Sequence, residues 1–484
     1  MDTGEDIATF LSTLLVVLRE EAVLATPQEK PVVVFKQPDL LQKELNLTLD
    51  ETCTEEELLL ICRKVARYSV KTSHPYFLNQ LYAGVDKYGL AGALFSEALN
   101  TNQYTYEVAP AFSLCEMEVI RKSLKLVGFT QGDGIFSPGG SLSNMYGIVL
   151  ARYQKCPNVK KSGIAGMKPF VVFTSKDAHY SFTKGAHWLG IGTDNVKAIE
   201  ADFNGRMIPE KIEEAIKMAI KEDKVPIMVN ATAGTTVLGA FDKFNDIADI
   251  CKKYGIWMHV DACWGGSLLF SKDYRYKLNG IERADSISWN PHKMLGAPLQ
   301  CSMFLVKHTN LLKECNMAGA TYLFQQDKMY DVKYDSGDKS LQCGRKVDAF
   351  KFWSMWKIRG SDQLSHMVDN AINCAKYFLE EIKKRHNFIL LLEEFDTSNV
   401  CFWYIPERLI GLEKTKTWWD EVNQIAPNLK KKFVEESCLM IGYQPLAHRN
   451  LKNFFRLVVT CHPVRTKAHM DNIIQMFERH GKNL

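Results

Sequence analysis

Two segments of the sequence place an acid and an amine where one ligand can reach both. Asp261 directly follows an apolar run at 256–260, and Lys293 ends the segment Asn290-Pro291-His292-Lys293, which follows a second predicted strand at 285–289. An acid after one strand and a lysine after the next suit a ligand with a carbonyl group and a nitrogen that must stay protonated. Either residue alone is unremarkable, because aspartates often cap helices and most lysines lie on the surface.

A glycine- and serine-rich turn is a candidate for binding a phosphate group of the same ligand. The segment Gly139-Gly140-Ser141-Leu142-Ser143-Asn144 precedes a helical pattern at 145–153. Glycines let the backbone approach a ligand closely, and a helix N-terminus with serine side chains attracts phosphate. A plain helix cap is the more common explanation of such a turn, so the segment supports the site without defining it.

His179 and Thr232 are two further candidates, and each lies just beyond a predicted strand. A lone histidine is more often structural than catalytic, so neither residue carries weight by itself. Pyridoxal phosphate, however, needs a lysine for its aldehyde, an acid for its pyridine nitrogen and a helix N-terminus for its phosphate. The acid keeps the nitrogen protonated, so that the ring accepts the electron pair released when a bond to the substrate Cα breaks. The residues together predict a pyridoxal phosphate site.

The elements that must position these residues alternate between short strands and helices. The apolar runs at 169–173, 225–229 and 256–260 have the length and flanking residues of buried strands. The spacing at 242–254 is helical, and Gly255 is a natural helix stop. This alternation predicts an α/β fold with a mainly parallel sheet, in which ligands bind beyond the carboxyl ends of the strands.

The length of 484 residues suits a large domain with smaller attachments rather than one simple domain. Residues 1–66 are predicted to form an N-terminal helical segment, and residues 67–365 to form a large cofactor-binding domain. Residues 366–484 are predicted to form a smaller C-terminal α/β domain, introduced by a long amphipathic helix near 362–385.

The composition argues against several classes of protein. The net charge of +4, with 46% hydrophobic and 24% charged residues, is ordinary for a globular protein and speaks against a nucleic-acid binder. The run Lys430-Lys431-Lys432 is interpreted as a solvated helix face. The apolar run at 10–18 is far shorter than the ~20 residues of a membrane span, and acidic residues precede it, so we expect neither a membrane segment nor a signal peptide.

The cysteines and histidines point to neither disulfides nor a metal site. Thirteen cysteines are scattered through the chain, with no CxxC pair and no HExxH motif. We therefore expect no bound metal, and free thiols in a reducing compartment, which predicts a cytoplasmic location.

From about Tyr68 to its C-terminus the chain resembles the group II pyridoxal-phosphate-dependent decarboxylases. Within that group it is similar to animal cysteine sulfinate and acidic amino acid decarboxylases. The resemblance implies a type I pyridoxal phosphate fold, as in aspartate aminotransferase, and a homodimer with its active site at the subunit interface. The motifs that carry the similarity are Phe77-Leu78-Asn79-Gln80-Leu81, Gln103-Tyr104-Thr105-Tyr106-Glu107, Asp133-Gly134-Ile135-Phe136, Asn290-Pro291-His292-Lys293, Gln326-Asp327-Lys328-Met329-Tyr330-Asp331-Val332 and Asn453-Phe454-Phe455-Arg456.

The resemblance also implies a role for each candidate around the cofactor. Lys293 is expected to bind it covalently, Asp261 to pair with the ring nitrogen and His179 to stack on one ring face. Cys263 is a departure, because the family usually has Ala or Ser on the opposite ring face, and the larger thiol puts the tilt of the ring in question. The remaining cofactor contacts that the resemblance implies are Thr232 near the ring hydroxyl and Ser141, Ser143 and His292 around the phosphate.

Two residues are implied to act on the substrate itself. Tyr330 resembles the family's proton donor to Cα and lies in a polar stretch that is expected to form a mobile loop. Arg456 resembles the residue that takes the substrate carboxylate. Without the resemblance, Tyr330 would be interpreted as an ordinary loop tyrosine.

The substrate is expected to have a short acidic side arm. Glutamate decarboxylases carry a small Ser at the position of Tyr82 and Met-Phe in place of Gln103-Tyr104, whereas this chain resembles the cysteine sulfinate type at both positions. Tyr82 fills space that a longer substrate needs, and Gln80 can donate to an acidic group. The expected reactions are cysteine sulfinate to hypotaurine, as in taurine biosynthesis, and aspartate to β-alanine, with glutamate decarboxylation as the alternative.

Two other readings use the same residues. Transamination needs the same lysine and aspartate, but the whole-chain resemblance favours decarboxylation. An inactive homologue that serves as a binding partner would be favoured by the loss of Lys293 or Tyr330, and both are present.

Overall fold

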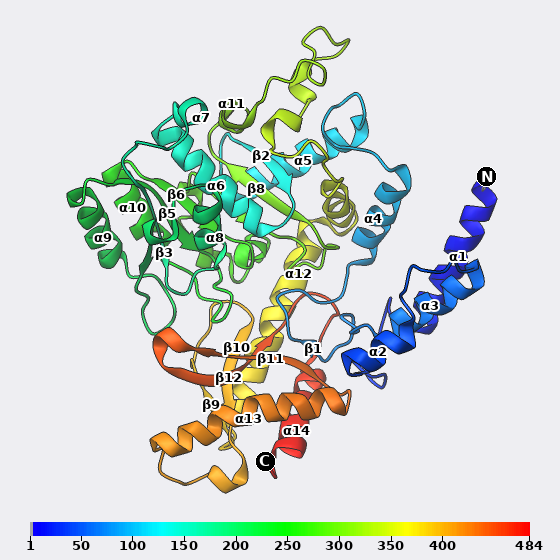
Figure 1. The fold of residues 1–484 in the computed structure, drawn as a ribbon. Coiled ribbons are helices and arrows are strands. Elements are labelled where there is room, and N and C mark those ends of the chain that lie inside the picture. Colours follow the sequence, from blue (N-terminus) through cyan, green and yellow to red (C-terminus); the bar gives the residue numbers. More distant parts are fainter. Residues whose placement is uncertain (1–2) are drawn as a thin grey trace. The chain divides into compact units, whose positions relative to one another are not determined.

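The structure, a computed structural model, describes residues 3–484, and Figure 1 labels their helices and strands. The chain divides into two compact units. The terminal unit comprises the residues through Gly84 together with Asn373–Glu393 and Val400–Leu484, and the central unit comprises Val85–Ile372 and Glu394–Asn399. The three domains expected at 1–66, 67–365 and 366–484 stay a prediction, because compactness alone does not show which segments fold independently.

A seven-stranded sheet forms the centre of the central unit, in the order β2-β8-β7-β6-β5-β3-β4. The five adjacent strands β7, β6, β5, β3 and β4 pair in parallel, whereas β8 is antiparallel to both β7 and β2. The expected mainly parallel α/β sheet is therefore confirmed. The strands are β2 (Asp133–Ser137), β3 (Phe170–Ser175), β4 (Val196–Ile199), β5 (Val225–Thr232), β6 (Trp257–Asp261), β7 (Ser286–Trp289) and β8 (Ser302–Val306).

Helices pack against this sheet, with α6 against β5, β7 and β8, and α10 against β5 and β6. The strand residues Val172, Met228, Val260 and Ile287 are fully buried, as expected when a parallel sheet is covered by helices. The helices of this unit are α4 (Lys87–Leu99), α5 (Pro110–Val127), α6 (Gly140–Lys155), α7 (Val159–Ser162), α8 (Ser181–Trp188), α9 (Pro209–Lys221), α10 (Phe244–Tyr254), α11 (Leu311–Asn316) and the greater part of α12 (Ala349–Lys383).

Local sequence signals account for several element ends. Gly255 terminates α10 in the left-handed conformation, with φ 60°, as its position predicted. The helix expected near 362–385 is the second part of α12, since Gly360, with φ 64°, interrupts a longer helical stretch. A glycine adopts this conformation without steric cost, so two helices follow one another across it.

The terminal unit contains a five-stranded sheet in the order β1-β11-β12-β10-β9. Its core is aromatic, with Phe402, Phe455 and Phe477 in mutual contact. No helix within residues 3–484 is long and apolar enough to cross a membrane. The elements are α1 (Gly4–Glu20), α2 (Pro38–Leu45), α3 (Glu55–Tyr68), β1 (Phe77–Leu78), β9 (Phe388–Leu390), β10 (Asn399–Tyr404), α13 (Lys416–Glu435), β11 (Met440–Leu446), β12 (Leu451–Val458) and α14 (Lys467–Gly481).

Candidate active site

A hollow of about 190 Å³ lies beyond the carboxyl ends of β5, β6 and β7. This is the edge at which parallel α/β sheets bind ligands. Seven of the residues expected to hold a cofactor line it: Ser141, His179, Thr232, Asp261, Cys263, His292 and Lys293.

Asp261 is the last residue of β6 and is almost completely buried. Its Oδ2 accepts a hydrogen bond from Asn144 Nδ2 at 2.9 Å, and its Oδ1 accepts one from the Cys263 backbone N–H at 3.1 Å. Burial alone would raise the pKa of this carboxyl, but Lys293 and His179 lower it by more, so the pKa lies below its ordinary value. A buried carboxylate that stays ionised is the partner that a protonated ring nitrogen needs.

A buried polar chain behind Asp261 fixes the orientation of its partner Asn144. The Asn144 Oδ1 lies 3.1 Å from His259 Nε2, and His259 Nδ1 lies 2.8 Å from Ser286 Oγ. Burial lowers the pKa of His259 to about 4, so the ring is neutral. Asn144 and His259 were missed as site residues, although Asn144 is the last residue of the glycine- and serine-rich segment identified in the sequence.

Lys293 is half-buried and lies in the turn that follows β7, where its backbone N–H donates to the Asn290 carbonyl at 3.0 Å. Within the part of the chain that the structure describes, its Nζ makes no hydrogen bond or ion pair. The amine therefore lies in the same hollow as Asp261 and is available to a carbonyl carbon.

The other two residues expected to contact the cofactor ring, His179 and Thr232, are neutral groups. Burial lowers the pKa of His179, so its imidazole is uncharged at neutral pH and suited to stacking on a ring. Thr232 ends β5, and its buried Oγ1 has no hydrogen-bond partner among residues 3–484. An orphaned hydroxyl in the wall of a hollow indicates that a polar group of a ligand completes it.

The turn before α6 is shaped for close approach of a ligand to the backbone. Gly139 has φ 95°, a conformation that favours glycine. A Cβ atom at Gly140 would come within 2.5 Å of Cys263 Sγ and 2.8 Å of Asn290 Nδ2, so only glycine fits. The first turn of α6 thus presents free N–H groups next to Ser141, as phosphate binding requires.

His292 and Ser143 differ in how they relate to this hollow. His292 lines it, and its Nδ1 lies 2.7 Å from the Cys301 carbonyl oxygen, while burial lowers its pKa to about 4. Ser143 is not among the lining residues, because its hydroxyl lies in a buried set with Ser137 Oγ at 2.6 Å and Ser302 Oγ at 3.2 Å. A phosphate contact of Ser143 stays a prediction.

Cys263 is buried in the wall of the hollow, and its thiol is neutral. Burial and the nearby Asp261 carboxylate raise its pKa well above the ordinary value for a cysteine. The side chain therefore acts as a small apolar surface rather than as a nucleophile.

Tyr330 is not among the residues that line this hollow. Its hydroxyl donates to Asp335 Oδ1 at 2.9 Å and accepts from the Glu107 backbone N–H at 3.2 Å, and its ring packs on Tyr106 with centroids 5.0 Å apart. Burial and Asp335 raise the pKa of Tyr330, so the hydroxyl keeps its proton. The structure therefore shows a protonated tyrosine held within its own chain, and its role as proton donor stays a prediction.

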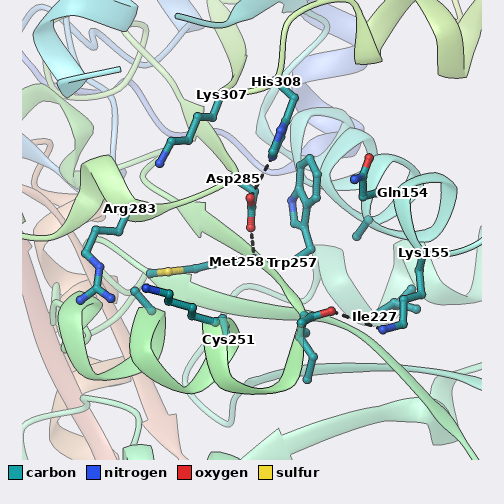
Figure 2. Close-up of a pocket in the computed structure, with 15 residues that line it drawn as sticks. Gln154, Lys155, Ile227, Cys251, Trp257, Met258, Arg283, Asp285, Lys307 and His308 are labelled. Carbon is teal, nitrogen blue, oxygen red and sulfur yellow. Dashed lines mark hydrogen bonds and ion pairs between the residues drawn. The ribbon is translucent and has the colours of Figure 1, made fainter. Parts of the chain in front are cut away.

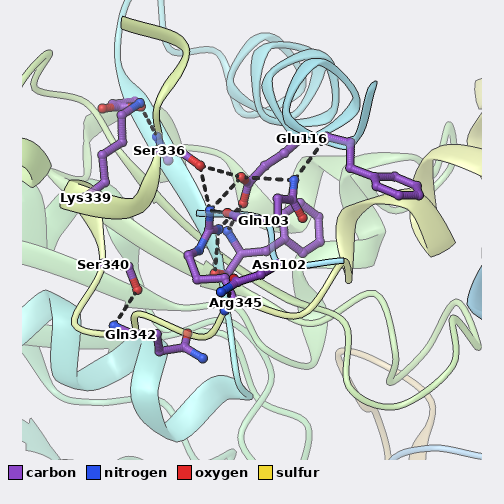
Figure 3. A network of polar contacts seen from close by, with 12 residues as sticks. Asn102, Gln103, Glu116, Ser336, Lys339, Ser340, Gln342 and Arg345 are labelled. Carbon is purple, nitrogen blue, oxygen red and sulfur yellow. Dashed lines mark hydrogen bonds and ion pairs between the residues drawn. The ribbon is translucent and has the colours of Figure 1, made fainter. Parts of the chain in front are cut away.

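The segment after Tyr330 is anchored by a buried ion pair (Figure 3). Arg345 Nη2 lies 2.5 Å from Glu116 Oε1, and Arg345 Nη1 donates to the Gln103 carbonyl at 2.7 Å. The Gln103 side chain is fully buried and donates to the Phe112 carbonyl at 2.8 Å. Gln103, a marker of the cysteine sulfinate type in the sequence, is thus a structural residue of this network within its own chain.

The three residues expected to bind substrate, Gln80, Tyr82 and Arg456, belong to the terminal unit. Arg456 on β12 is buried and donates from Nη2 to the Asn79 carbonyl at 3.2 Å. Tyr82 is half-buried and packs against the buried Phe77, with ring centroids 6.3 Å apart, whereas Gln80 is exposed. Their action on a substrate stays a prediction.

A larger hollow, of about 570 Å³, lies at the amino ends of β6 and β7 (Figure 2). In its centre Asp285 accepts from the Met258 backbone N–H at 2.8 Å and contacts His308 Nε2 at 2.9 Å. None of the residues expected to bind cofactor or substrate lines it. Its size does not make it the reaction site, because it lacks a free amine beside a buried acid.

Comparison with known proteins identifies the family of this chain. Residues 38–405 match the family described as the pyridoxal-dependent decarboxylase conserved domain. The cysteine sulfinic acid decarboxylase of Homo sapiens is 50% identical over 471 residues, which cover 97% of this chain and 95% of that protein. The acidic amino acid decarboxylase GADL1 of Xenopus tropicalis is 49% identical, with 97% and 91% covered. The crystal structure of mouse CSAD superposes with a TM-score of 0.96 at 47% identity and covers 100% of both chains.

The chain therefore belongs to the pyridoxal-dependent decarboxylase family, and the expected type I fold is confirmed. Family membership makes pyridoxal phosphate its cofactor. The residues present fit that group, since the hollow offers an ionised acid at Asp261, an available amine at Lys293, an orphaned hydroxyl at Thr232 and a glycine cradle at Gly140.

Proposed function

We propose that this decarboxylase removes the α-carboxylate from a small acidic amino acid, either cysteine sulfinate, giving hypotaurine, or aspartate, giving β-alanine. One observation carries the proposal: Lys293 and Asp261 line one hollow beside the glycine cradle, in a chain about half identical to cysteine sulfinic acid decarboxylases. Glutamate is the competing substrate.

When bound, pyridoxal phosphate supplies an electron sink for the pair that is left when the Cα–carboxylate bond breaks. Lys293 would hold its aldehyde carbon, and the first turn of α6 with Ser141 would hold its phosphate. Asp261 would keep a proton on the ring nitrogen, because Asn144 and the Cys263 N–H hold the carboxylate in place and ionised. These groups are fixed before the reaction begins, so no reorganisation is needed while charge develops.

The other side chains would orient the substrate and return a proton. Arg456 is a buried guanidinium suited to one acid group of the substrate, and the exposed Gln80 can donate to the other. Tyr330 keeps its proton and would deliver it to Cα after carbon dioxide leaves. To do so the tyrosine must leave Asp335, which makes its loop a gating element.

The preference for a short substrate rests on Tyr82. Its ring packs on Phe77, which limits how far it can move. One methylene is worth only ~1–3 kcal/mol of fit in an open pocket, but a bulky residue in the way adds the cost of overpacking. Glutamate should therefore react much more slowly than the shorter acids.

The proposal includes a homodimer with an active site at the subunit interface, in the cytoplasm. Ile7, Leu11 and Leu15 on α1 are 52%, 50% and 45% exposed and form one stripe, which a second copy of the chain would cover. None of the thirteen cysteines, all of which lie within residues 3–484, forms a disulfide, which suits a reducing compartment.

The test is a decarboxylation assay of the purified holoenzyme with cysteine sulfinate, cysteate, aspartate and glutamate side by side. We expect release of carbon dioxide from cysteine sulfinate and aspartate, with higher kcat/KM than for glutamate. A preference for glutamate would refute the substrate assignment, and no release from any of the four would refute the proposed function.

A further inference from the structure

Lys430 is not part of a solvated helix face, contrary to the interpretation of its sequence. It lies on α13, which packs against β11 and β12 (Figure 1). Its Nζ donates to the Ile441 carbonyl at 2.6 Å and to Asn79 Oδ1 at 3.1 Å. The interpretation holds for Lys431, whose side chain is 74% exposed. Lys430 and Lys431 differ in exposure because Lys430 lies next to Leu429, which is buried on the packed side of α13.

Lys430 shares Asn79 with Arg456. The carbonyl oxygen of Asn79 accepts from Arg456 Nη2 at 3.2 Å, and its side-chain oxygen accepts from Lys430. The half-buried ammonium of Lys430 thus lies near the buried guanidinium of Arg456. Both hydrogen-bond partners of the Lys430 ammonium are uncharged oxygens. No carboxylate among residues 3–484 forms an ion pair with Lys430.

The electrostatic consequence is that Lys430 is a half-buried cation without an anionic partner among residues 3–484. Burial and the charge of Arg456 lower the pKa of Lys430 to about 8. A buried charge is costly unless it is paired, and no side chain of the described chain supplies the pair. An anion bound beside Arg456 would stabilise the charged form of Lys430 and raise its pKa.

We propose that Lys430 is a specificity-determining residue of the decarboxylase, a second cation beside Arg456 that selects substrates by an acid group. This inference rests on the proposed function, because it assigns Arg456 to one acid of the substrate. Two basic groups around one carboxylate or sulfinate give a stronger charge requirement than a single arginine. The cluster of Asn79, Lys430 and Arg456 then explains why an acidic amino acid is favoured over a neutral one of the same length.

A purely structural role predicts different behaviour from a charge role. In a purely structural role, here called a clamp, Lys430 holds Asn79 and Ile441 together only by donating hydrogen bonds to them. A side-chain amide can donate the same kind of hydrogen bond. Lys430→Gln keeps donors and removes the charge, Lys430→Met removes both, and Lys430→Arg keeps the charge. Lys431→Gln is the matched control, because it makes the same chemical change on the exposed face one residue away.

The experiment measures kcat and KM of the holoenzyme variants with cysteine sulfinate, alongside thermal unfolding. We expect Lys430→Gln and Lys430→Met to raise KM by about 10- to 100-fold, the cost of losing a charge-assisted hydrogen bond, with a smaller change in kcat. Lys430→Arg should retain most of the affinity, and Lys431→Gln should match wild type.

The pH dependence of KM gives a second readout that a clamp would not move. Wild-type KM should rise above about pH 8, as the ammonium loses its proton, while KM of Lys430→Gln and Lys430→Arg should stay level to pH 9. Among the groups packed near Lys430, Arg456 stays charged over this range, and Cys401 on β10, beside Arg456, has its pKa raised to about 12 by burial. The His480 of α14 contacts Lys432 rather than Lys430.

Three results would overturn the inference. Wild-type KM for Lys430→Gln together with a raised KM for Lys430→Met would assign a clamp. Equal effects of Lys430→Gln and Lys431→Gln would show that position 430 is not special. A wild-type KM that does not change with pH, or that changes equally in Lys430→Arg, would refute the charge role even if Lys430→Gln fails to fold. Failure of the wild type to decarboxylate any acidic amino acid would instead refute the proposed function.

Discussion

Asp261→Asn tests the proposed electronic role of the carboxylate, because the substitution removes the negative charge while it keeps size and shape. In the wild type both oxygens accept hydrogen bonds, one from Asn144 and one from the Cys263 N–H. An asparagine offers one oxygen, so its amide nitrogen must face a second donor. The variant therefore loses both the negative charge and one of the two hydrogen bonds.

The magnitude follows from these two losses. Loss of a preorganised charged group opposite the ring nitrogen should raise the barrier by about 3 kcal/mol or more, which lowers kcat by ~100-fold or more. The unmatched buried donor should cost a further ~1–3 kcal/mol of folding stability. The Asp261 pKa lies below 3.8, so its contribution to stability is present above about pH 4 and is lost as the pH falls through the lower, folded-state value. The ratio of wild-type to variant kcat should thus stay constant between about pH 6 and pH 9.

The assay is kcat at saturating cysteine sulfinate, with cofactor occupancy measured by absorbance and folding by thermal unfolding. Asp285→Asn is the matched control, since Asp285 is also an aspartate at a strand end that accepts a backbone N–H, but at the opposite edge of the sheet. It should lose stability and keep wild-type turnover. Near-normal kcat in a folded, cofactor-loaded Asp261→Asn variant would refute the electronic role.

The remaining predictions concern three residues. Lys293→Ala should abolish product formation, and borohydride reduction of the wild type should fix the cofactor to the peptide that contains Lys293; a label on any other peptide would overturn the site. Tyr330→Phe should lower kcat by about 100-fold or more and increase release of the cofactor in its amine form, measured by its absorbance; unchanged turnover without this side product would remove Tyr330 from the mechanism. Tyr82→Ser should raise kcat/KM for glutamate by about tenfold relative to that for cysteine sulfinate, and no gain would show that Tyr82 does not limit substrate length.

Many of the strands and helices, and the grouping of Asp261 with Lys293, were accessible from the sequence, because local signals encode them. The strand before Asp261 lies in a short apolar run, and Pro291 marks the end of the strand before Lys293, so both residues could be assigned to one edge of the sheet. The roles of Tyr330, Arg456 and Tyr82 came from resemblance alone, since no local pattern distinguishes them from ordinary loop and core residues.

Only the tertiary structure decided which polar residues are buried and with what partners. Asn144 and His259 support Asp261 through contacts between residues more than a hundred positions apart, which no periodicity reports. The buried Gln103 forms hydrogen bonds with Glu116 and Arg345. Lys430 contacts Asn79, although it belongs to a run of three lysines that was interpreted from the sequence as a solvated helix face. Charge and hydrogen bonding depend on distance in space and on burial. The sequence by itself therefore determined the sheet and the chemical groups at its edge, while the packing of distant segments determined which of those groups stay charged.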